Sequence, residues 1–436
     1  MEQVTQPTLD DLTDDRPERA VIVAVGREDE EMARSLAELE ALASTAGAQL
    51  VARLIQALQK PKPATFIGVG KLDELEALVL SVDADLAVFD AELTPRQNRN
   101  LTDRLPCKVM DRTEVILDIF AQRARSREGK LQVELAQLRY ALPRLYGRGK
   151  LMSRIGGGMR GTGPIGTRGP GRTKLEVDRS RIQHRMARIR KELGEVARRR
   201  EVSRAARESA GVPAISLIGY TNAGKSSLLN ALAGGEEVSV RNRLFETLDT
   251  TSRRVSIGDG REAIASDTVG FVRHLPHHLV AAFRATLEEA LAADLLIQVI
   301  DISDPDQRKQ QEATEEVLEE LGAADKPMIY ALNKADLSTE LGALEAAVAG
   351  LPKAVITSAT TGYGMDALRE LVRDSLVEPL ASVTLEVPYN ALHVLNVAPE
   401  EGRVLHYDYQ PEYVIAEAEL TSAALGRLRA YVVAEA

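Results

Sequence analysis

The chain has 436 residues, of which 44% are hydrophobic and 28% are charged, and its formal net charge is −10. This composition excludes a wholly disordered chain, and the length exceeds the roughly 250 residues at which a single core stops growing. The single cysteine, Cys107, excludes an intramolecular disulfide, and no Cys/His cluster has the spacing of a zinc site.

The first quarter of the chain alternates apolar runs of strand length with helical stretches. Residues 1–19 are polar, lack a secretory signal and are expected to form a flexible tail. No later run reaches the ~20 apolar residues that span a bilayer, so we expect a cytoplasmic protein without membrane insertion. The runs at Ala20–Val25 and Ala84–Phe89 are typical of strands, and Glu30–Ala46 is typical of a helix. This alternation predicts an α/β domain over residues 20–110.

Residues 111–212 are predicted to form a long antiparallel helical hairpin. Apolar residues recur at helical spacing from Asp111 to Leu145, with Gly129 the only weak point, and a second helix runs from about Thr173 to Ser209. Two helices with narrow apolar stripes usually pack on each other. The stripes consist of Leu131, Leu135 and Leu138 on the first helix and Ile182, Met186, Ile189 and Leu193 on the second.

Between these helices lies Gly147–Gly171, here called the basic loop, with ten glycines and two prolines. Such a segment cannot hold a regular element, so we expect a flexible tip. The 41 residues of Leu135–Leu175 contain no acidic residue, which favours RNA binding over the alternative of a solvated charged coiled coil. The candidate RNA contacts are Arg148, Lys150, Arg154, Arg160, Arg168, Arg172 and Lys174.

The stretch GYTNAGKS follows the strand-like run Ala214–Gly219 and precedes a helix, as a phosphate-binding loop requires. Backbone N–H groups and the helix end can cradle phosphate. We expect Lys225 to reach the β- and γ-phosphates and the Ser226 hydroxyl to bind Mg²⁺. The expected nucleotide contacts are Gly219, Tyr220, Thr221, Asn222, Ala223, Gly224, Lys225 and Ser226.

Two segments are expected to close over the γ-phosphate. The polar stretch Arg243–Arg254 matches a first switch, in which Thr247 would bind Mg²⁺, with Thr250 and Thr251 as weaker candidates. Asp267, at the end of an apolar strand, would hold Mg²⁺ through water, and the Gly270 N–H would meet the γ-phosphate. The expected contacts are Phe245, Glu246, Thr247, Leu248, Asp249, Asp267, Thr268, Val269 and Gly270, and the expected catalytic residues are Lys225, Thr247, Asp267 and Gly270.

A fourth motif, NKAD at Asn333–Asp336, predicts the nucleotide base. A carboxylate at Asp336 can accept hydrogen bonds from the guanine N1–H and amine, which adenine does not supply. The expected base contacts are Asn333, Lys334, Ala335, Asp336, Ser358, Ala359 and Thr360. The order of these motifs predicts a P-loop GTPase domain over residues 213–380, followed by a small α+β domain of βαββα-like order over residues 381–436.

Phe271 occupies the position where many GTPases place a water-orienting glutamine. A phenyl ring cannot polarise water, so we expect slow turnover without a partner. Asn222 lies where some related GTPases coordinate K⁺, and we hypothesise that K⁺ supplies positive charge here.

Four stretches closely resemble the HflX family of translational GTPases: Phe66–Leu75, Leu93–Leu101, Asp111–Tyr140 and Gly166–Ile182. The resemblance implies a GTPase that binds the large ribosomal subunit, inserts its glycine-rich loop near the peptidyl-transferase centre and splits stalled or idle ribosomes, often under stress. We expect a monomer that hydrolyses GTP faster on ribosomes. The alternatives are a ribosome-assembly or RNA-associated GTPase without splitting activity, and an RNA-binding module with negligible hydrolysis.

This sequence departs from the family pattern in two places. Arg172 and Lys174 stand where members usually have an acid and an amide, and Glu246 stands where alanine is usual. Some family members are described as using ATP through the N-terminal domain. Gly68, Gly70 and Lys71 form a glycine-lysine turn, for which we favour a plain structural role over an ATP site.

Overall fold

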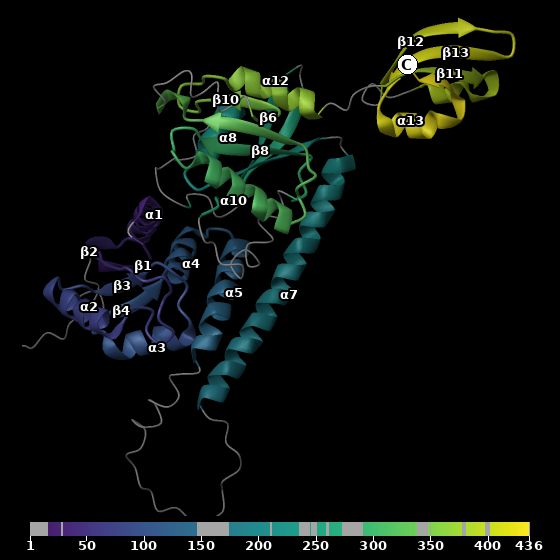
Figure 1. Cartoon of the computed structure of the whole chain (residues 1–436). Coiled ribbons are helices and arrows are strands. Elements are labelled where there is room, and N and C mark those ends of the chain that lie inside the picture. Colours follow the sequence, from purple (N-terminus) through teal and green to yellow (C-terminus); the bar gives the residue numbers. More distant parts are fainter. Residues whose placement is uncertain are drawn as a thin grey trace, which may run out of the picture. The chain divides into compact units, whose positions relative to one another are not determined.

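The computed structural model of the chain (Figure 1) describes residues 16–27, 29–145, 174–209, 212–234, 245, 251–258, 261–272, 291–337, 348, 350–376, 381–396 and 402–435. The chain divides into two units, Met1–Leu368 and Arg369–Ala436. The basic loop and most of the first switch lie outside the described residues.

The N-terminal sheet is parallel throughout, with the order β2-β1-β3-β4. Alternate side chains of its strands enter two hydrophobic clusters: Ala20, Ile22 and Ala24 pack with α1 and α4, whereas Val21 and Val23 pack with α2 and α3. Helices therefore cover both faces, as parallel sheets require. The strands are β1 (Arg19–Val25), β2 (Gln49–Gln56), β3 (Leu86–Phe89) and β4 (Lys108–Asp111), and the helices are α1 (Glu30–Ala46), α2 (Val69–Ser81), α3 (Pro95–Arg104) and α4 (Arg112–Arg123).

The glycine-lysine turn at Gly68 is part of a helix start. Gly68 is the N-cap of α2, and its N–H donates to Gln56 Oε1 at 2.8 Å. Lys71 lies in the first turn of that helix and forms an ion pair with Glu74 at 2.9 Å. These contacts agree with a structural role.

The helical stretch predicted over Asp111–Leu145 is two helices, and the prediction of Gly129 as its weak point is wrong. α4 ends at Arg123, and α5 (Arg127–Arg144) begins after Ser126. The Ser126 hydroxyl accepts a hydrogen bond from the Gly129 N–H at 2.8 Å, so serine capping defines the break and Gly129 sits within the first turn. α4 packs with the N-terminal sheet.

α5 packs against α7 (Lys174–Ser209) along the two predicted stripes. Leu131 and Leu135 are buried together with Met186 and Ile189. Glu128 pairs with Arg200 while Glu134 pairs with Arg185, so the helices run antiparallel, as Figure 1 also shows.

The GTPase sheet has the order β10-β9-β8-β5-β7-β6, and only β6 is antiparallel to its neighbour. The carboxyl ends of its parallel strands carry the predicted nucleotide motifs, which is where open α/β sheets bind ligands. The strands are β5 (Ala214–Gly219), β6 (Thr251–Gly258), β7 (Arg261–Asp267), β8 (Leu295–Asp301), β9 (Met328–Asn333) and β10 (Ala354–Ile356). The helices are α8 (Lys225–Ala233), α10 (Gln307–Glu320), η3 (Ala335–Leu337) and α12 (Met365–Leu376).

The second unit contains an antiparallel sheet with the order β12-β13-β11-β14. The βαββα-like expectation lacked its closing strand, β14, which is only four residues long and carries too short an apolar pattern to stand out. The elements are β11 (Ala381–Pro388), η4 (Tyr389–Leu395), β12 (Gly402–Tyr409), β13 (Tyr413–Leu420), α13 (Ser422–Leu428), η5 (Arg429–Tyr431) and β14 (Val432–Glu435). The predicted fold class is thus confirmed: a P-loop GTPase domain, an N-terminal α/β domain with a helical hairpin, and a small α+β domain.

Within the described residues, no helix is both long enough and apolar enough to cross a membrane.

Candidate nucleotide site

The phosphate-binding loop runs from the end of β5 to the start of α8. Gly219 has φ +140°, and a Cβ there would lie 2.3 Å from the Val299 carbonyl oxygen. Gly224 has φ +92°, and a Cβ there would lie 2.3 Å from Asn333 Nδ2. Both positions therefore require glycine, for conformation and for space. The loop leads directly into the N-terminus of α8, where the positive end of the helix lies at the place expected for the phosphates.

Lys225 is buried and arches back over the loop. Its ammonium donates hydrogen bonds to the carbonyl oxygens of Gly219 at 3.1 Å and Tyr220 at 2.9 Å. Burial lowers the pKa of Lys225 to about 8, although the nearby Asp267 carboxylate opposes this shift. Lys225 is thus held at the centre of the loop, as expected for a phosphate ligand.

Ser226 and Asp267 meet beside this lysine. The Ser226 hydroxyl donates to Asp267 Oδ2 at 2.5 Å, and Asp267 is buried at the end of β7. Hydroxyl and carboxylate oxygens are ligands that Mg²⁺ prefers, so the pair fits the predicted metal site. Thr251 begins β6 opposite Asp267, whereas Thr250, Glu246, Thr247, Leu248 and Asp249 lie outside the described residues.

Gly270 is pressed against the phosphate-binding loop. A Cβ at this position would lie 2.7 Å from Thr221 Cα and 2.9 Å from Lys225 Nζ. The preceding Thr268 is fixed by a hydrogen bond from its hydroxyl to the Leu217 carbonyl oxygen at 2.7 Å. The DTVG segment after β7 therefore lies in close contact with the phosphate-binding loop.

Phe271 extends this contact. Its N–H donates to the Gly219 carbonyl at 3.1 Å, and its carbonyl accepts from the Thr221 N–H at 2.7 Å. Its ring is 3% exposed and lies in the hydrophobic core with Tyr220 and Ile218. Phe271 is therefore a core residue whose backbone braces the loop.

Asn333 joins three loops of the expected base site. Its amide nitrogen donates to the Ala223 carbonyl at 3.0 Å, and its amide oxygen accepts from the Ala359 N–H at 3.1 Å. The next residue, Lys334, has φ +66° and pairs with Asp301 at 2.7 Å. The structure thus brings the NKAD motif to the phosphate-binding loop.

Asp336 faces the loop after β10. The Ser358 hydroxyl donates to Asp336 Oδ1 at 2.5 Å and keeps the pKa of this carboxyl below its usual value. Thr360 lies 3.0 Å from the same hydroxyl, and the Ala335 N–H donates to Thr357 at 3.1 Å. The predicted base contacts are therefore assembled around an ionised carboxylate.

Phe245, one of the expected nucleotide contacts, has its ring in the N-terminal core. Its ring is 2% exposed and packs edge to face on Phe120 of α4. Val269 and Val272 belong to the same hydrophobic cluster. The side chain therefore faces the N-terminal core, because a phenyl ring gains more from this burial than from a polar phosphate site.

No pattern in the sequence predicts the contacts between the phosphate-binding loop and the N-terminal domain. The Tyr220 hydroxyl donates to Glu38 Oε2 at 2.8 Å across a separation of 182 residues, and Arg34 pairs with Asp306. Glu38 and Arg34 lie on α1, in a stretch that reads as an ordinary amphipathic helix.

Three family models match consecutive parts of the chain. They are described as GTP-binding GTPase N-terminal, GTP-binding GTPase Middle Region and 50S ribosome-binding GTPase, and they match residues 33–121, 123–207 and 214–334. A protein named GTPase HflX from Caldanaerobacter subterraneus subsp. tengcongensis is 44% identical over 427 residues, covering 98% of this chain and 96% of that protein. The chain belongs to the HflX family of GTPases.

GTPase HflX of Escherichia coli is 40% identical to this family member over 404 residues, which cover 92% of this chain and 91% of that protein. A crystal structure of a GTP-binding protein from Sulfolobus solfataricus in complex with GDP is also similar, with 26% identity, a TM-score of 0.43, and coverage of 82% of this chain and 98% of that one. The resemblance predicted from sequence is confirmed. Because the relatives are named GTPases, membership of this family supports GTP as the substrate and its hydrolysis as the reaction.

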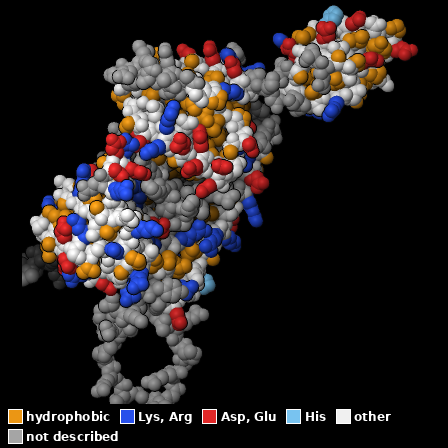
Figure 2. All heavy atoms as spheres, in the orientation of Figure 1, with side chains coloured by type: hydrophobic (Ala, Val, Ile, Leu, Met, Phe, Trp, Pro, Cys, Tyr) orange, Lys and Arg blue, Asp and Glu red, His pale blue; other side chains and the backbone are white. Residues whose placement is uncertain are grey.

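Of the seven predicted RNA contacts, the structure describes only Lys174. Arg148, Lys150, Arg154, Arg160, Arg168 and Arg172 lie outside the described residues, and Lys174 is described only as the first residue of α7. Figure 2 shows Lys and Arg side chains (blue) on the visible face near α5 and α7. The exposed basic residues of α7 include Arg179, Arg181, Arg188, Arg190, Lys191, Arg198 and Arg199.

Proposed function

We propose that this HflX-family GTPase binds the large ribosomal subunit through its basic hairpin and splits stalled or idle ribosomes. The observation that carries the proposal is the two-helix hairpin of α5 and α7, whose connecting segment contains no acidic residue and many arginines. A thin hairpin with such a tip can enter a narrow RNA-lined cavity, because each arginine that meets a phosphate releases counterions. Ribosomal RNA near the peptidyl-transferase centre is the proposed target.

In this proposal the nucleotide site controls when the protein acts on the ribosome. Lys225 would neutralise the β- and γ-phosphates, and Gly270 would sense the γ-phosphate through its N–H. Ser226 and Asp267 would hold Mg²⁺, with Thr247 joining them in the GTP state. When bound, Mg²⁺ neutralises charge that develops on the phosphate oxygens. Asp336 would restrict the substrate to guanine nucleotides.

Hydrolysis should be slow until the ribosome supplies a group that orients the attacking water. The Phe271 ring is buried in the core and offers no group that could orient water. Stimulation by ribosomes is therefore part of the proposal. We also propose that K⁺ bound near Asn222, which adopts φ +63°, contributes positive charge, and equal rates in K⁺ and Na⁺ buffers would contradict this.

The decisive experiment is a ribosome-splitting assay in sucrose gradients with a nonhydrolysable GTP analogue. Wild type should convert whole ribosomes to subunits, and a variant with the basic loop shortened should not. An assembly factor without splitting activity would leave whole ribosomes intact in both cases. Phosphate release with and without ribosomes, measured in parallel, separates a GTPase from an RNA-binding module that hardly hydrolyses GTP.

A charge-matched comparison identifies the contact surface. Replacing Arg148 and Arg154 with glutamine should weaken binding to large subunits and reduce the salt dependence by about one unit of slope per lost phosphate contact. Replacing Arg96 and Arg99, which are exposed on α3, is the control and should leave both unchanged. Equal losses in the two variants would contradict an RNA contact at the loop.

A further inference from the structure

A buried polar chain begins at the phosphate-binding loop. The Tyr220 hydroxyl donates to Glu38 Oε2 at 2.8 Å, and the other oxygen of Glu38 pairs with Arg112. Arg112 also donates to Asp90 Oδ1 at 2.9 Å, and Ser35 donates to Asp90 Oδ2 at 2.6 Å. Arg112 is only 3% exposed, so its guanidinium is fixed between two carboxylates on α1 and at the end of β3.

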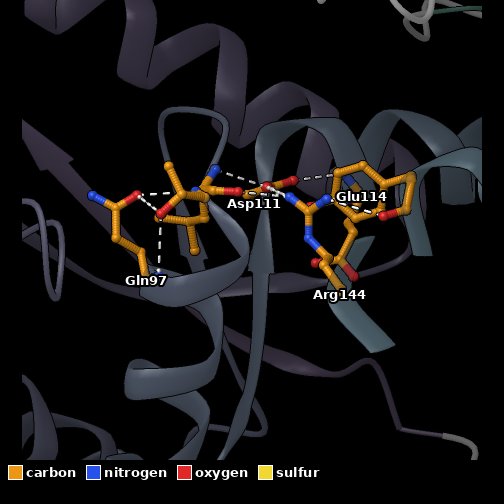
Figure 3. Close-up of polar contacts among 7 residues, drawn as sticks. Gln97, Asp111, Glu114 and Arg144 are labelled. Atoms are coloured by element: carbon orange, nitrogen blue, oxygen red, sulfur yellow. Dashed lines mark hydrogen bonds and ion pairs between the residues drawn. The ribbon is translucent and has the colours of Figure 1, made fainter. Parts of the chain in front are cut away.

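Asp111, the residue before Arg112, lies at the centre of a second buried polar cluster (Figure 3). Asp111 is fully buried, and its Oδ2 accepts hydrogen bonds from the Leu93 N–H at 2.9 Å, from Arg144 at 3.2 Å and from the Tyr140 hydroxyl. Its other oxygen accepts from the Glu114 N–H at 3.0 Å and caps α4. One carboxylate thus joins β4, α4, the loop before α3 and the end of α5.

The end of α5 is the root of the basic loop. Arg144 lies over the Tyr140 ring at 3.3 Å and donates to the Leu93 carbonyl at 2.6 Å. In Figure 3 the Arg144 guanidinium points toward Asp111, beside the start of α3, where Gln97 accepts from the Thr94 N–H at 2.9 Å. The last turn of α5, which enters the basic loop two residues after Leu145, is therefore held by the Asp111 cluster.

Backbone hydrogen bonds on either side of Tyr220 join the phosphate-binding loop to the segment that we expect to contact the γ-phosphate. Phe271 bonds to Gly219 and to Thr221, on either side of Tyr220, and directly follows Gly270. A displacement of Gly270 would therefore move the residue that holds Glu38.

We propose that the adjacent residues Asp111 and Arg112 couple the phosphate-binding loop to the root of the basic loop, so that the bound nucleotide sets how firmly the last turn of α5 is held. Arg112 receives the signal through Glu38, and Asp111 transmits it to Tyr140 and Arg144. Because the two residues are adjacent at the start of α4, a displacement of the backbone at this point moves both. The coupling requires GTP binding but not ribosome splitting, so it can fail or hold independently of the proposed function.

Hydrogen–deuterium exchange of the full chain tests the coupling without ribosomes. In wild type at saturating nucleotide, exchange of the peptide Ala136–Leu145 should differ by about fivefold or more between GDP and a nonhydrolysable GTP analogue. Tyr220→Phe, which removes only the hydroxyl, should abolish this difference. The control is Tyr330→Phe, which removes a similar hydroxyl contact, 3.2 Å from Glu315, on the far strand β9 and should preserve it.

A second variant works from the other end of the route. Because coupling is reciprocal, Tyr140→Phe should change the ratio of the affinities for the GTP analogue and GDP, which a loss of general stability would not do. Glu38→Gln serves in place of Tyr220→Phe if the latter binds nucleotide too weakly to saturate. Equal exchange in the two nucleotide states of wild type, or an unchanged nucleotide difference in Tyr220→Phe or Glu38→Gln, would overturn the proposal.

Discussion

The rings of Phe120 and Phe245 meet edge to face, with their centroids 4.6 Å apart. Phe120 belongs to α4 of the N-terminal domain, and Phe245 belongs to the first switch segment. Both side chains are almost fully buried. The switch is thus fixed at one end to the core of another domain, which the position of Phe245 in the sequence does not suggest.

This contact leads to a first prediction. Phe245→Leu should lower the free energy of unfolding by about 0.5–1.5 kcal/mol, the worth of an aromatic pair beyond its buried area. It should also change the ratio of affinities for a GTP analogue and GDP, because it frees the start of the switch. Phe89→Leu is the control, since it breaks the edge-to-face pair with Phe66 in the other hydrophobic cluster. Denaturant unfolding and nucleotide titrations measure both quantities, and a matching change of ratio in the control would contradict the prediction.

Asn333 gives the second prediction. Asn333→Ala removes the hydrogen bond to the Ala223 carbonyl and the acceptor for the Ala359 N–H, and it leaves buried groups without partners. Such groups cost about 1–3 kcal/mol each, so GDP affinity should fall by roughly tenfold or more. Asn100→Ala, which removes an exposed hydrogen bond to the Ala64 carbonyl, should bind GDP like wild type. Fluorescent GDP titration distinguishes them, and unchanged affinity of Asn333→Ala would disprove the role of this link.

The local part of this site could be predicted from the sequence. The strand before Gly219, the glycine positions and the NKAD turn are each set by residues within a few positions, and the stripes on α5 and α7 follow from simple helical periodicity. The break before α5 was missed because Ala124, Arg125 and Ser126 do not interrupt the apolar pattern. Only the Ser126 cap reveals it.

The contacts between domains could not be predicted from one sequence. Tyr220 and Glu38 are separated by 182 residues, and a glutamate on α1 looks like any other exposed helix residue until the fold brings a tyrosine to it. The same holds for Asp111 of β4, whose partners are Leu93 in the loop before α3 and Tyr140 on α5. Tertiary packing alone defines such networks.

Lys225 gives the third prediction, which concerns pH. Its pKa falls from 10.5 to about 8 because burial disfavours the charged ammonium. Between these values the unfolded chain binds more protons than the folded one, so the stability of the nucleotide-free protein should rise with pH. GDP affinity should instead fall above about pH 8, since phosphate prefers the ammonium form. Urea unfolding and GDP titration across this range check both trends. Lys225→Met should remove both, and persistence of either would assign it to another group.

Glu114 gives the fourth prediction, with the opposite sign. Burial, reinforced by Asp111, raises its pKa from 4.5 to about 7. Between these values the folded chain holds a proton that the unfolded chain has lost, so this group's contribution to stability should decrease as pH rises. Glu114→Gln should flatten the profile in that window, whereas Glu74→Gln, an exposed control on α2, should not. Urea unfolding from about pH 4.5 to about pH 7 measures the slope, and an unchanged slope in Glu114→Gln would refute the assignment.

The last prediction concerns the hairpin that the proposed function depends on. Ile189 is fully buried between α7 and α5, together with Leu131, Leu135 and Met186. Ile189→Ala should weaken this packing by about 2–5 kcal/mol, because it removes apolar contacts and leaves a cavity. Val202 lies on the same helix but is 73% exposed, so Val202→Ala should change stability by less than about 0.5 kcal/mol. Hydrogen exchange of α7 amides should therefore accelerate around residues 182–193 in the first variant alone.

GDP affinity of the Ile189→Ala variant shows whether the hairpin and the nucleotide site are independent. If this affinity stays at the wild-type value while exchange rises, the hairpin is stabilised by its own apolar stripe rather than by the GTPase domain. Shortening the basic loop then tests the tip of the hairpin without affecting the nucleotide site. Acceleration in both variants would instead mean that α7 unfolds as one unit whichever face is altered.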